Sequence, residues 1–322
     1  MKCNADLSVP IPIRKSDLFP DGVRCVGLAA PAGPVSRSAY ENACRFLTGL
    51  GIRIAAGKSI LQGELLSYVS APAEKRVEDL NELIRNPEID AVYCLRGGYG
   101  SVHLLDRLDW DTLRQRKLPL GGYSDITVLH AAMVSRHAGR AVSVCMALKL
   151  AEDARGAAFR RNFRRAWGVS IQPQGDFRRI AGGLRALTGG TESVEAKLFC
   201  GNLTMLASLC GTGYLPGQAG KMIFLEDIAE PVRKLDRSLM QLKLSGFFKD
   251  CAGVVFGDFK QCGSPEERQE LFRRFSAGLS VPVFSGLHYG HCSRSISLVC
   301  GETAIIRNGS LYLRDPFNAE RS

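Results

Sequence analysis

A serine at position 124 occurs where a parallel sheet places a nucleophile. It lies in the run 121–127 (GGYSDIT), between an apolar strand expected over 118–123 and a helix expected over 126–137. Such a strand-to-helix turn exposes a side chain at the carboxyl edge of the sheet, where these sheets hold their active sites. Gly-x-Ser-x-Gly is not matched, because Ile126 takes the last position. Taken alone, the pattern favours a serine that only caps the following helix.

A serine nucleophile needs a base, and the chain has five histidines. His288 and His291 follow an expected strand in the glycine-rich run 285–291 (SGLHYGH). A histidine held in such a loop can turn toward a partner and exchange protons near neutral pH. The remaining histidines fall on expected helices and are interpreted as surface or core residues: His103, His130 and His137.

Two carboxylates could orient such a base. Glu226 and Asp227 directly follow the apolar run 222–225. Burying a charge there costs free energy unless the charge is paired or takes part in catalysis. The order serine, glutamate, histidine is also that of α/β-hydrolase triads, although here the base and the sheet fall in separate halves of the chain.

A glycine-rich loop follows another expected strand, at 90–95. The run 97–100 (GGYG) can turn backbone N–H groups toward an anion or an oxyanion. It is neither a dinucleotide fingerprint nor a P-loop. Alone, it is weak evidence for a site.

The elements around these residues predict an α/β fold. Up to residue 146, short apolar strands alternate with amphipathic helices, as in a parallel sheet covered on both faces. Ser36 is expected to cap the first of these helices. The pattern predicts an N-terminal extension at 1–20, a first domain at 21–168, a linker at 169–190 and a second domain at 191–322.

The second domain is expected to be richer in strands. Strands are expected over 195–200, 222–225, 253–256 and 281–284, and helices between them. Asn308 and Gly309 predict the two-residue turn of a closing hairpin.

Composition narrows the class of protein. Of 322 residues, 45% are apolar and 23% charged, which excludes general disorder, and no apolar run is long enough to span a membrane. The N-terminus does not read as a secretory signal, so the expected location is the cytoplasm. The 11 cysteines lack C-x-x-C spacing and are expected to be reduced. Cys292 and Cys300 have no evident metal-binding partners, and no metal site is expected.

The net charge is +10. The densest basic cluster is 159–167 (FRRNFRRAW), whose aromatic residues recur every four positions. We interpret it as an amphipathic surface helix with Arg160 to Arg165 on it, and no nucleic-acid-binding motif accompanies it.

Five motifs together carry a resemblance to a known family. They are, in chain order, 95–101 (LRGGYGS), 122–127 (GYSDIT), 201–203 (GNL), 224–230 (FLEDIAE) and 290–291 (GH). In this order and spacing the chain resembles the LD-carboxypeptidase family of serine peptidases, which also contains the microcin C self-immunity proteins. The resemblance covers about 23–306.

The resemblance implies an enzyme that removes the terminal D-residue of cytoplasmic murein tetrapeptides during cell-wall recycling, without metal or cofactor. By motif, Ser124 is the nucleophile, His291 the base and Glu226 its orienting partner. The family's fold implies a Rossmann-like nucleophile domain and a smaller, β-rich α/β domain, with the site in the cleft between them and a homodimer as the assembly. Other residues are carried over as oxyanion or substrate-binding groups: Gly98, Asp125, Arg96 and Asn202.

Three alternatives stay open at this point. His288 competes with His291 as the base, because the family usually has an apolar residue there. An amidase for peptidyl or aminoacyl nucleotides, as in the immunity branch, would need a platform that the segment 159–167 could supply. A third possibility is a non-catalytic muropeptide sensor. Arg96 is a candidate partner for a substrate carboxylate, although an internal ion pair is an equal expectation.

Overall fold

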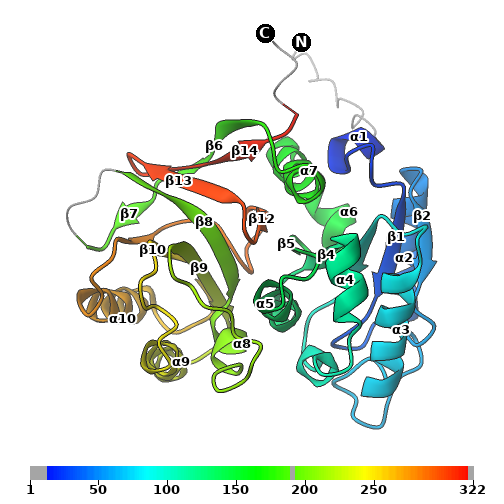
Figure 1. Ribbon diagram of the computed structural model, residues 1–322, viewed down its shortest axis with the longest axis horizontal. Coiled ribbons are helices and arrows are strands. Elements are labelled where there is room, and N and C mark those ends of the chain that lie inside the picture. Colours follow the sequence, from blue (N-terminus) through cyan, green and yellow to red (C-terminus); the bar gives the residue numbers. More distant parts are fainter. Residues whose placement is uncertain (1–12, 189–192, 318–322) are drawn as a thin grey trace, which may run out of the picture.

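The structure is a computed structural model that describes residues 13–188 and 193–317. Parts of three expected segments lie outside these ranges: most of the extension at 1–20, the end of the linker at 169–190, and both ends of the second domain at 191–322. The chain builds two sheets side by side, the first mainly from the N-terminal half and the second from the C-terminal half (Figure 1).

The first sheet confirms the expected parallel arrangement. Its strand order is β12-β5-β4-β3-β1-β2, in which β1 to β5 run parallel and β12 is antiparallel to β5. The order 2-1-3-4-5 is one of the doubly wound orders, which place sites at the carboxyl ends of the strands. The strands of this sheet are β1 (Cys25–Ala29), β2 (Arg53–Ala56), β3 (Ala91–Cys94), β4 (Pro119–Gly122), β5 (Arg140–Ser143) and β12 (Leu298–Val299).

Helices follow the strands much as the periodicity predicts. Ser36 caps α2 by accepting a hydrogen bond from the Ala39 amide, as expected. The helices of this half are α1 (Lys15–Leu18), α2 (Arg37–Gly49), α3 (Ala73–Arg85), α4 (Trp110–Arg116), α5 (Thr127–Ser135), α6 (Leu150–Asp153) and α7 (Ala157–Ile171).

The second sheet is mixed. Its order is β6-β14-β13-β8-β9-β10-β11-β7, and β8 to β11 are parallel. Asn308 and Gly309 both have positive φ, 49° and 64°, and form the expected hairpin turn between β13 and β14. The strands are β6 (Asp176–Gly182), β7 (Arg185–Ala186), β8 (Ser193–Asn202), β9 (Lys221–Ile228), β10 (Gly253–Lys260), β11 (Val283–Ser285), β13 (Thr303–Arg307) and β14 (Ser310–Asp315).

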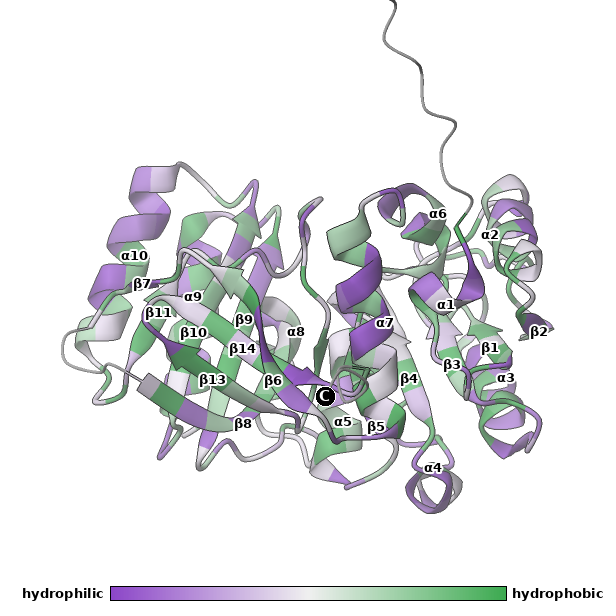
Figure 2. Ribbon diagram, turned by 90° about the horizontal axis from the view of Figure 1, so that it is seen from above, coloured by the Kyte–Doolittle hydropathy of each residue, from purple (hydrophilic) through white to green (hydrophobic). Residues whose placement is uncertain are grey.

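Three helices pack with this sheet: α8 (Leu203–Ala207), α9 (Val232–Leu244) and α10 (Pro265–Ala277). The last begins with Pro265 after a capping box in which Ser264 and Glu267 bond each other's amides. Strands β9 and β10 are mostly hydrophobic, whereas α10 outside them carries many hydrophilic residues (Figure 2).

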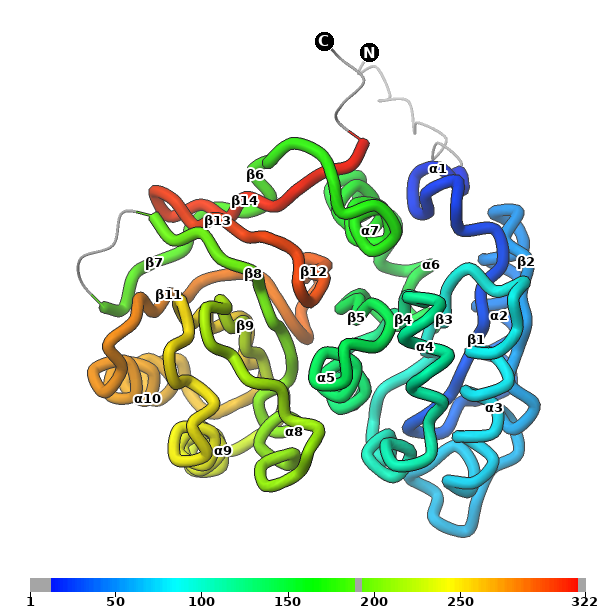
Figure 3. Tube along the Cα trace, viewed as in Figure 1, coloured from blue at the N-terminus to red at the C-terminus, as the bar shows by residue number. Residues whose placement is uncertain are grey.

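Two expected boundaries differ in the structure. The segment expected as a linker contains the end of α7 and supplies β6 and β7 to the second sheet. Residues 298–299, in the expected second domain, add β12 to the first sheet. Between the sheets, α5 lies beside α8 (Figure 3), and one hydrophobic core includes Leu129 of α5 and Leu203 of α8. The two halves therefore share a core.

Helix α7 is only in part the amphipathic surface helix that its pattern predicts: Arg161 is exposed, but residues 165–170 are all buried. Phe163 and Trp167 are fully buried against Phe19 and Tyr93, and Arg165 is buried with them. Of the aromatic residues in 159–167, only Phe159 keeps exposed surface. The buried rings are explained by packing of α7 between α1 and the first sheet.

Within the described residues, no helix is both long enough and apolar enough to cross a membrane. The cysteines of these residues are all free thiols.

Candidate active site

Ser124 lies in a tight turn directly after β4. A short 3₁₀ turn spans Ser124–Ile126, and Ser124 has φ 61°, the left-handed conformation that is uncommon for residues other than glycine. Neither this turn nor α5 is capped by a side chain. The helix-capping interpretation of Ser124 is therefore wrong.

The glycine loop after β3 passes next to this serine. A Cβ atom on Gly97 would lie 3.2 Å from Ser124 Oγ, so the backbone approaches the hydroxyl closely. Gly98 and Gly100 have φ of 117° and 116°, which only glycine adopts readily. The Gly33 amide donates to Gly97 O at 3.0 Å and ties the loop to the turn after β1.

Asp125 fixes the same loop from the other side. Its buried carboxylate accepts a hydrogen bond from the Ser101 amide at 2.9 Å, while the Arg76 guanidinium donates to Gly100 O at 2.9 Å. Burial raises the pKa of Asp125, and the hydrogen bonds from Ser101 oppose this. The role of this carboxylate and of Arg76 in shaping the loop has no signal in the sequence pattern.

Two free N–H groups remain beside Ser124. The amides of Gly98 and Asp125 donate to no acceptor in the described part of the chain. Free backbone donors next to a nucleophile can stabilise an oxyanion.

His291 and Glu226 form a buried pair. Nδ1 of His291 lies 2.7 Å from Oε2 of Glu226, and the side chains are 15% and 2% exposed. The imidazole packs against Tyr123, the residue before Ser124, with ring centroids 4.7 Å apart. Because Glu226 occupies Nδ1, only Nε2 is left to meet a hydroxyl. No hydrogen bond joins Ser124 Oγ to His291 among the described residues.

Gly290 is needed for this pair. It has φ 116°, and a Cβ atom there would lie 2.5 Å from Oε2 of Glu226. The glycine therefore lets the loop bring His291 onto the carboxylate, which explains the Gly-His motif.

Asn202 lies behind Glu226. Its Nδ2 donates to Oε1 of Glu226 at 3.2 Å and to Oδ1 of Asp227 at 2.9 Å, and its Oδ1 caps α8 by accepting from the Met205 amide. The side chain is buried and its polar atoms are all engaged. Asn202 therefore positions the carboxylate of Glu226, and its role in substrate binding stays a prediction.

The two acidic residues at the end of β9 are both paired, as their apolar context requires. Glu226 meets His291, and Asp227 accepts hydrogen bonds from the amide and hydroxyl of Thr204. Burial raises the pKa of Glu226, while the bond to His291 lowers it.

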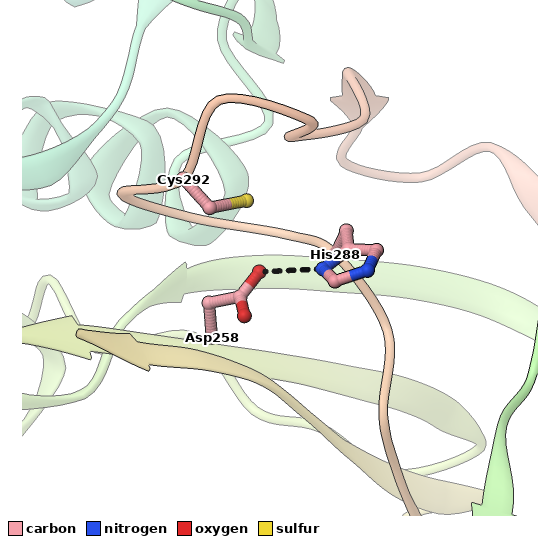
Figure 4. A group of neighbouring side chains, drawn as sticks. All are labelled: Asp258, His288 and Cys292. Carbon is pink, nitrogen blue, oxygen red and sulfur yellow. Dashed lines mark hydrogen bonds and ion pairs between the residues drawn. The ribbon is translucent and has the colours of Figure 1, made fainter.

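His288 lies apart from this pair. Its side chain is 57% exposed, and its Nδ1 lies 3.4 Å from Oδ2 of Asp258 rather than near Glu226. Cys292 lies beside these two (Figure 4). Asp258 belongs to β10, which is distant from Cys292 in sequence, so a local pattern around Cys292 does not reveal this neighbour.

Arg96 is exposed on the glycine loop. One guanidinium nitrogen donates to Pro34 O at 2.8 Å, and Arg96 makes no ion pair in the described ranges. The internal ion pair considered for it is thus absent from these ranges, which leaves guanidinium donors available.

A small pocket of about 30 Å³ opens between the two halves. Tyr123 and Val144 line it from the first half, and Gly290 and Cys292 from the second. Nearby, the Tyr289 hydroxyl lies 3.1 Å from Ser143 Oγ and joins the halves. Ser124, Glu226 and His291 do not line this pocket, but Tyr123 and Gly290, which do, are the chain neighbours of Ser124 and His291.

Comparisons with known proteins agree with this arrangement. The LD-carboxypeptidase N-terminal domain matches residues 26–143, and the LD-carboxypeptidase C-terminal domain matches residues 195–306. A murein tetrapeptide carboxypeptidase of Pseudomonas aeruginosa is 33% identical, over 89% of this chain and 94% of that protein. A muramoyltetrapeptide carboxypeptidase from Oxalobacter formigenes has a structure with a TM-score of 0.72 and 26% identity, covering 90% of this chain and 97% of that chain.

The microcin C7 self-immunity protein of Escherichia coli is more distant. It is 23% identical, over 85% of this chain and 86% of that protein. A structure of a protein of that name, in complex with aspartyl sulfamoyl adenosine, has a TM-score of 0.71 and 21% identity, covering 92% of this chain and 97% of that chain. The structural likeness at this identity shows the fold. With both domain models matched, the chain belongs to the LD-carboxypeptidase family and is a serine-type carboxypeptidase.

Proposed function

We propose that the protein hydrolyses the L,D-peptide bond before the terminal D-Ala of murein tetrapeptides, with Ser124, His291 and Glu226 as a catalytic triad. The observation that carries this proposal is the 2.7 Å pair of His291 and Glu226, whose imidazole packs on the residue before Ser124. A base oriented by a buried carboxylate, next to a strained serine turn, is the arrangement that activates a hydroxyl.

In the first step, Ser124 Oγ attacks the carbonyl carbon before D-Ala and His291 Nε2 takes the hydroxyl proton. The negative charge on the carbonyl oxygen is stabilised by the amides of Gly98 and Asp125, which have no other acceptor. The C–N bond then breaks, the imidazolium gives its proton to the leaving amine, and D-Ala departs.

The second step releases the acyl group. Water attacks the ester on Ser124 while His291 takes its proton. The imidazolium then returns a proton to Ser124 Oγ as the C–O bond breaks, which leaves a tripeptide acid and free enzyme. Glu226 stays ionised throughout and stabilises the imidazolium.

We propose that Arg96 binds the free carboxylate of D-Ala. It lies on the loop that carries Gly98, is exposed, and has unused donors for a carboxylate.

A pair of substrates tests this function. The wild-type protein is incubated with a tetrapeptide ending in meso-diaminopimelate–D-Ala and with the same peptide ending in L-Ala, and products are measured by mass spectrometry. Release of D-Ala and not L-Ala is the expected result.

The alternatives predict other outcomes. Cleavage of a peptidyl-adenylate analogue but of neither peptide would contradict the carboxypeptidase and indicate the nucleotide-conjugate amidase. Phe163 and Trp167 are buried, so the aromatic platform that this activity would need from segment 159–167 is reduced to Phe159, which lines the pocket between the halves. Tight tetrapeptide binding with no turnover would indicate a sensor.

Cytoplasmic cell-wall recycling and a homodimer complete the proposal. Light scattering of the purified protein is expected to give twice the 35.0 kDa mass of the chain. The mass of a single chain would contradict the dimer.

A further inference from the structure

We propose that Asp258, His288 and Cys292 form a binding site for a divalent transition-metal ion of the Zn²⁺ type, separate from the triad. One potential ligand atom from each residue lies within 4.8 Å of the other two. The three side chains come from two elements, β10 and the loop after β11 (Figure 4).

The donors fit this class of ion. A carboxylate oxygen, an imidazole nitrogen and a thiolate sulfur together suit Zn²⁺ or Co²⁺ better than the hard ions Mg²⁺ and Ca²⁺, which take oxygen ligands. Ligands of a tetrahedral Zn²⁺ lie about 3.3–3.7 Å apart. His288 Nδ1 and Asp258 Oδ2 already have this spacing, at 3.4 Å, so the movement needed is mainly that of the Cys292 sulfur toward them. The half-exposed His288 ring is free to adjust to this movement.

The backbone that holds the donors is already in place. β10 changes register between Phe256 and Phe259, and such bulges redirect side chains. A Cβ atom on Gly257 would lie 2.5 Å from Tyr289 O, so this glycine lets the loop lie against β10. The Asp258 amide donates to Tyr289 O at 2.8 Å, and the Ile296 amide donates to His288 O at 2.9 Å.

Metal binding would therefore need side-chain rotation with little backbone change. The ion displaces the proton of the Cys292 thiol to solvent, and three protein ligands leave a fourth position for water. Because Gly290 and His291 lie between two of the ligands, the bound ion clamps the loop that carries His291 to β10.

Cobalt absorption tests the site directly. Wild-type full-length protein, treated with a chelator and then dialysed, is titrated with CoCl₂. We expect a saturable thiolate-to-cobalt charge-transfer band. His288→Asn and Cys292→Ser are each expected to remove the band or weaken Co²⁺ binding by more than about tenfold.

Matched variants separate this site from other thiols and from the triad. Cys210→Ser and His291→Ala are expected to keep the band, because neither residue is in the group. Added ZnCl₂ should raise the Tm of the wild type with increasing concentration, and not that of Cys292→Ser. No band in the wild type, or a band that persists in a folded Cys292→Ser protein, would overturn the proposal. Both readouts are independent of peptidase activity.

Discussion

At the scale of single residues, the candidate site depends on the hydrogen bonds of the Glu226 carboxylate and the His291 imidazole. Oε1 of Glu226 is held by Asn202, while Oε2 meets Nδ1 of His291. This fixes the ring so that Nε2 is left for the hydroxyl of Ser124. The base is thus oriented by residues of its own half of the molecule, whereas Ser124 belongs to the other half.

Glu226→Gln tests this orientation. A glutamine amide in place of Oε2 would donate to Nδ1 and force the proton onto Nε2, where it prevents acceptance from Ser124. We expect kcat for D-Ala release to fall by about 10²- to 10⁴-fold with a smaller change in KM.

Glu230→Gln serves as the control, because Glu230 pairs with Lys234 and not with the triad. Its kcat should stay near that of the wild type. A Glu226→Gln protein that keeps full kcat would show that the carboxylate does not orient the base.

The proposed triad residues stand out in the sequence, and the family resemblance assigns their roles, but the residues that support them could not be predicted. Ser124, Glu226 and His291 are signalled by local features: a strand-to-helix turn, a charge at the end of an apolar strand, and a glycine-bound histidine. Asn202 and Asp258 act through contacts between elements distant in sequence. Contacts of this kind leave no signal in a local sequence pattern.

At the scale of elements, glycines set how closely loops and strands approach. Gly290→Ala would place a methyl group 2.5 Å from Oε2 of Glu226 and push the carboxylate from His291. We expect a loss of kcat of at least about 10²-fold in a protein that still folds, measured as D-Ala release beside circular dichroism.

Gly301→Ala is the matched control, since Gly301 has a similar positive φ of 90° but open space around its Cβ position. Both variants carry the backbone strain of alanine at positive φ, and only one displaces the glutamate. Equal losses of kcat in the two would contradict the role given to Gly290.

Helix α5 carries a pH-dependent contribution to stability. His130 is buried against β4, with Nε2 3.0 Å from Leu120 O, and burial lowers its pKa to about 4. The unfolded chain, with an ordinary histidine pKa of about 6.5, binds the proton more readily than the folded protein between these values. The contribution of the neutral His130 to stability is therefore complete above about pH 6.5, and it is lost as the pH falls toward 4.

Urea unfolding at about pH 7 and about pH 5 measures this loss. We expect His130 to account for about 2 kcal/mol of it, and His130→Gln to remove that share. His137→Gln, at an exposed position, should leave the pH dependence as in the wild type. If His130→Gln also leaves it unchanged, His130 is not the group responsible.

The elements themselves were largely predictable, because apolar strands and capped helices are local patterns. The parallel order of the first sheet, the cap at Ser36 and the turn at Asn308 all match expectation. The prediction of a linker at 169–190 is wrong because glycine and glutamine are typical of loops, whereas β6 in this segment is held by pairing with β14. Such edge pairing is not visible in a local pattern.

At the scale of the whole molecule, one buried ion pair joins the two halves. Arg165 of α7 donates to Glu302 and to Ser297 O, and both charged side chains are 1% exposed. The burial of Arg165 could not be predicted from the sequence, because the basic cluster 159–167 is typical of an exposed helix face.

Loss of one partner should therefore destabilise the whole fold. Arg165→Leu leaves the Glu302 carboxylate buried without its cation, and we expect the free energy of unfolding to fall by about 3–5 kcal/mol in chemical denaturation. The double variant with Glu302→Leu should recover part of this loss.

An exposed pair provides the comparison. Lys149 and Glu152 are 63% and 65% exposed, so Lys149→Ala should change stability by less than about 1 kcal/mol. An Arg165→Leu protein as stable as the Lys149→Ala protein would contradict the structural role of the buried pair.

The central claim is that Ser124 is the nucleophile of an L,D-carboxypeptidase. Its most direct test is mass spectrometry of D-Ala release from the murein tetrapeptide by wild-type and Ser124→Ala proteins, with peptide binding measured by calorimetry. We expect release by the wild type alone and binding by both. Release of D-Ala by Ser124→Ala at the rate of the wild type would contradict the account.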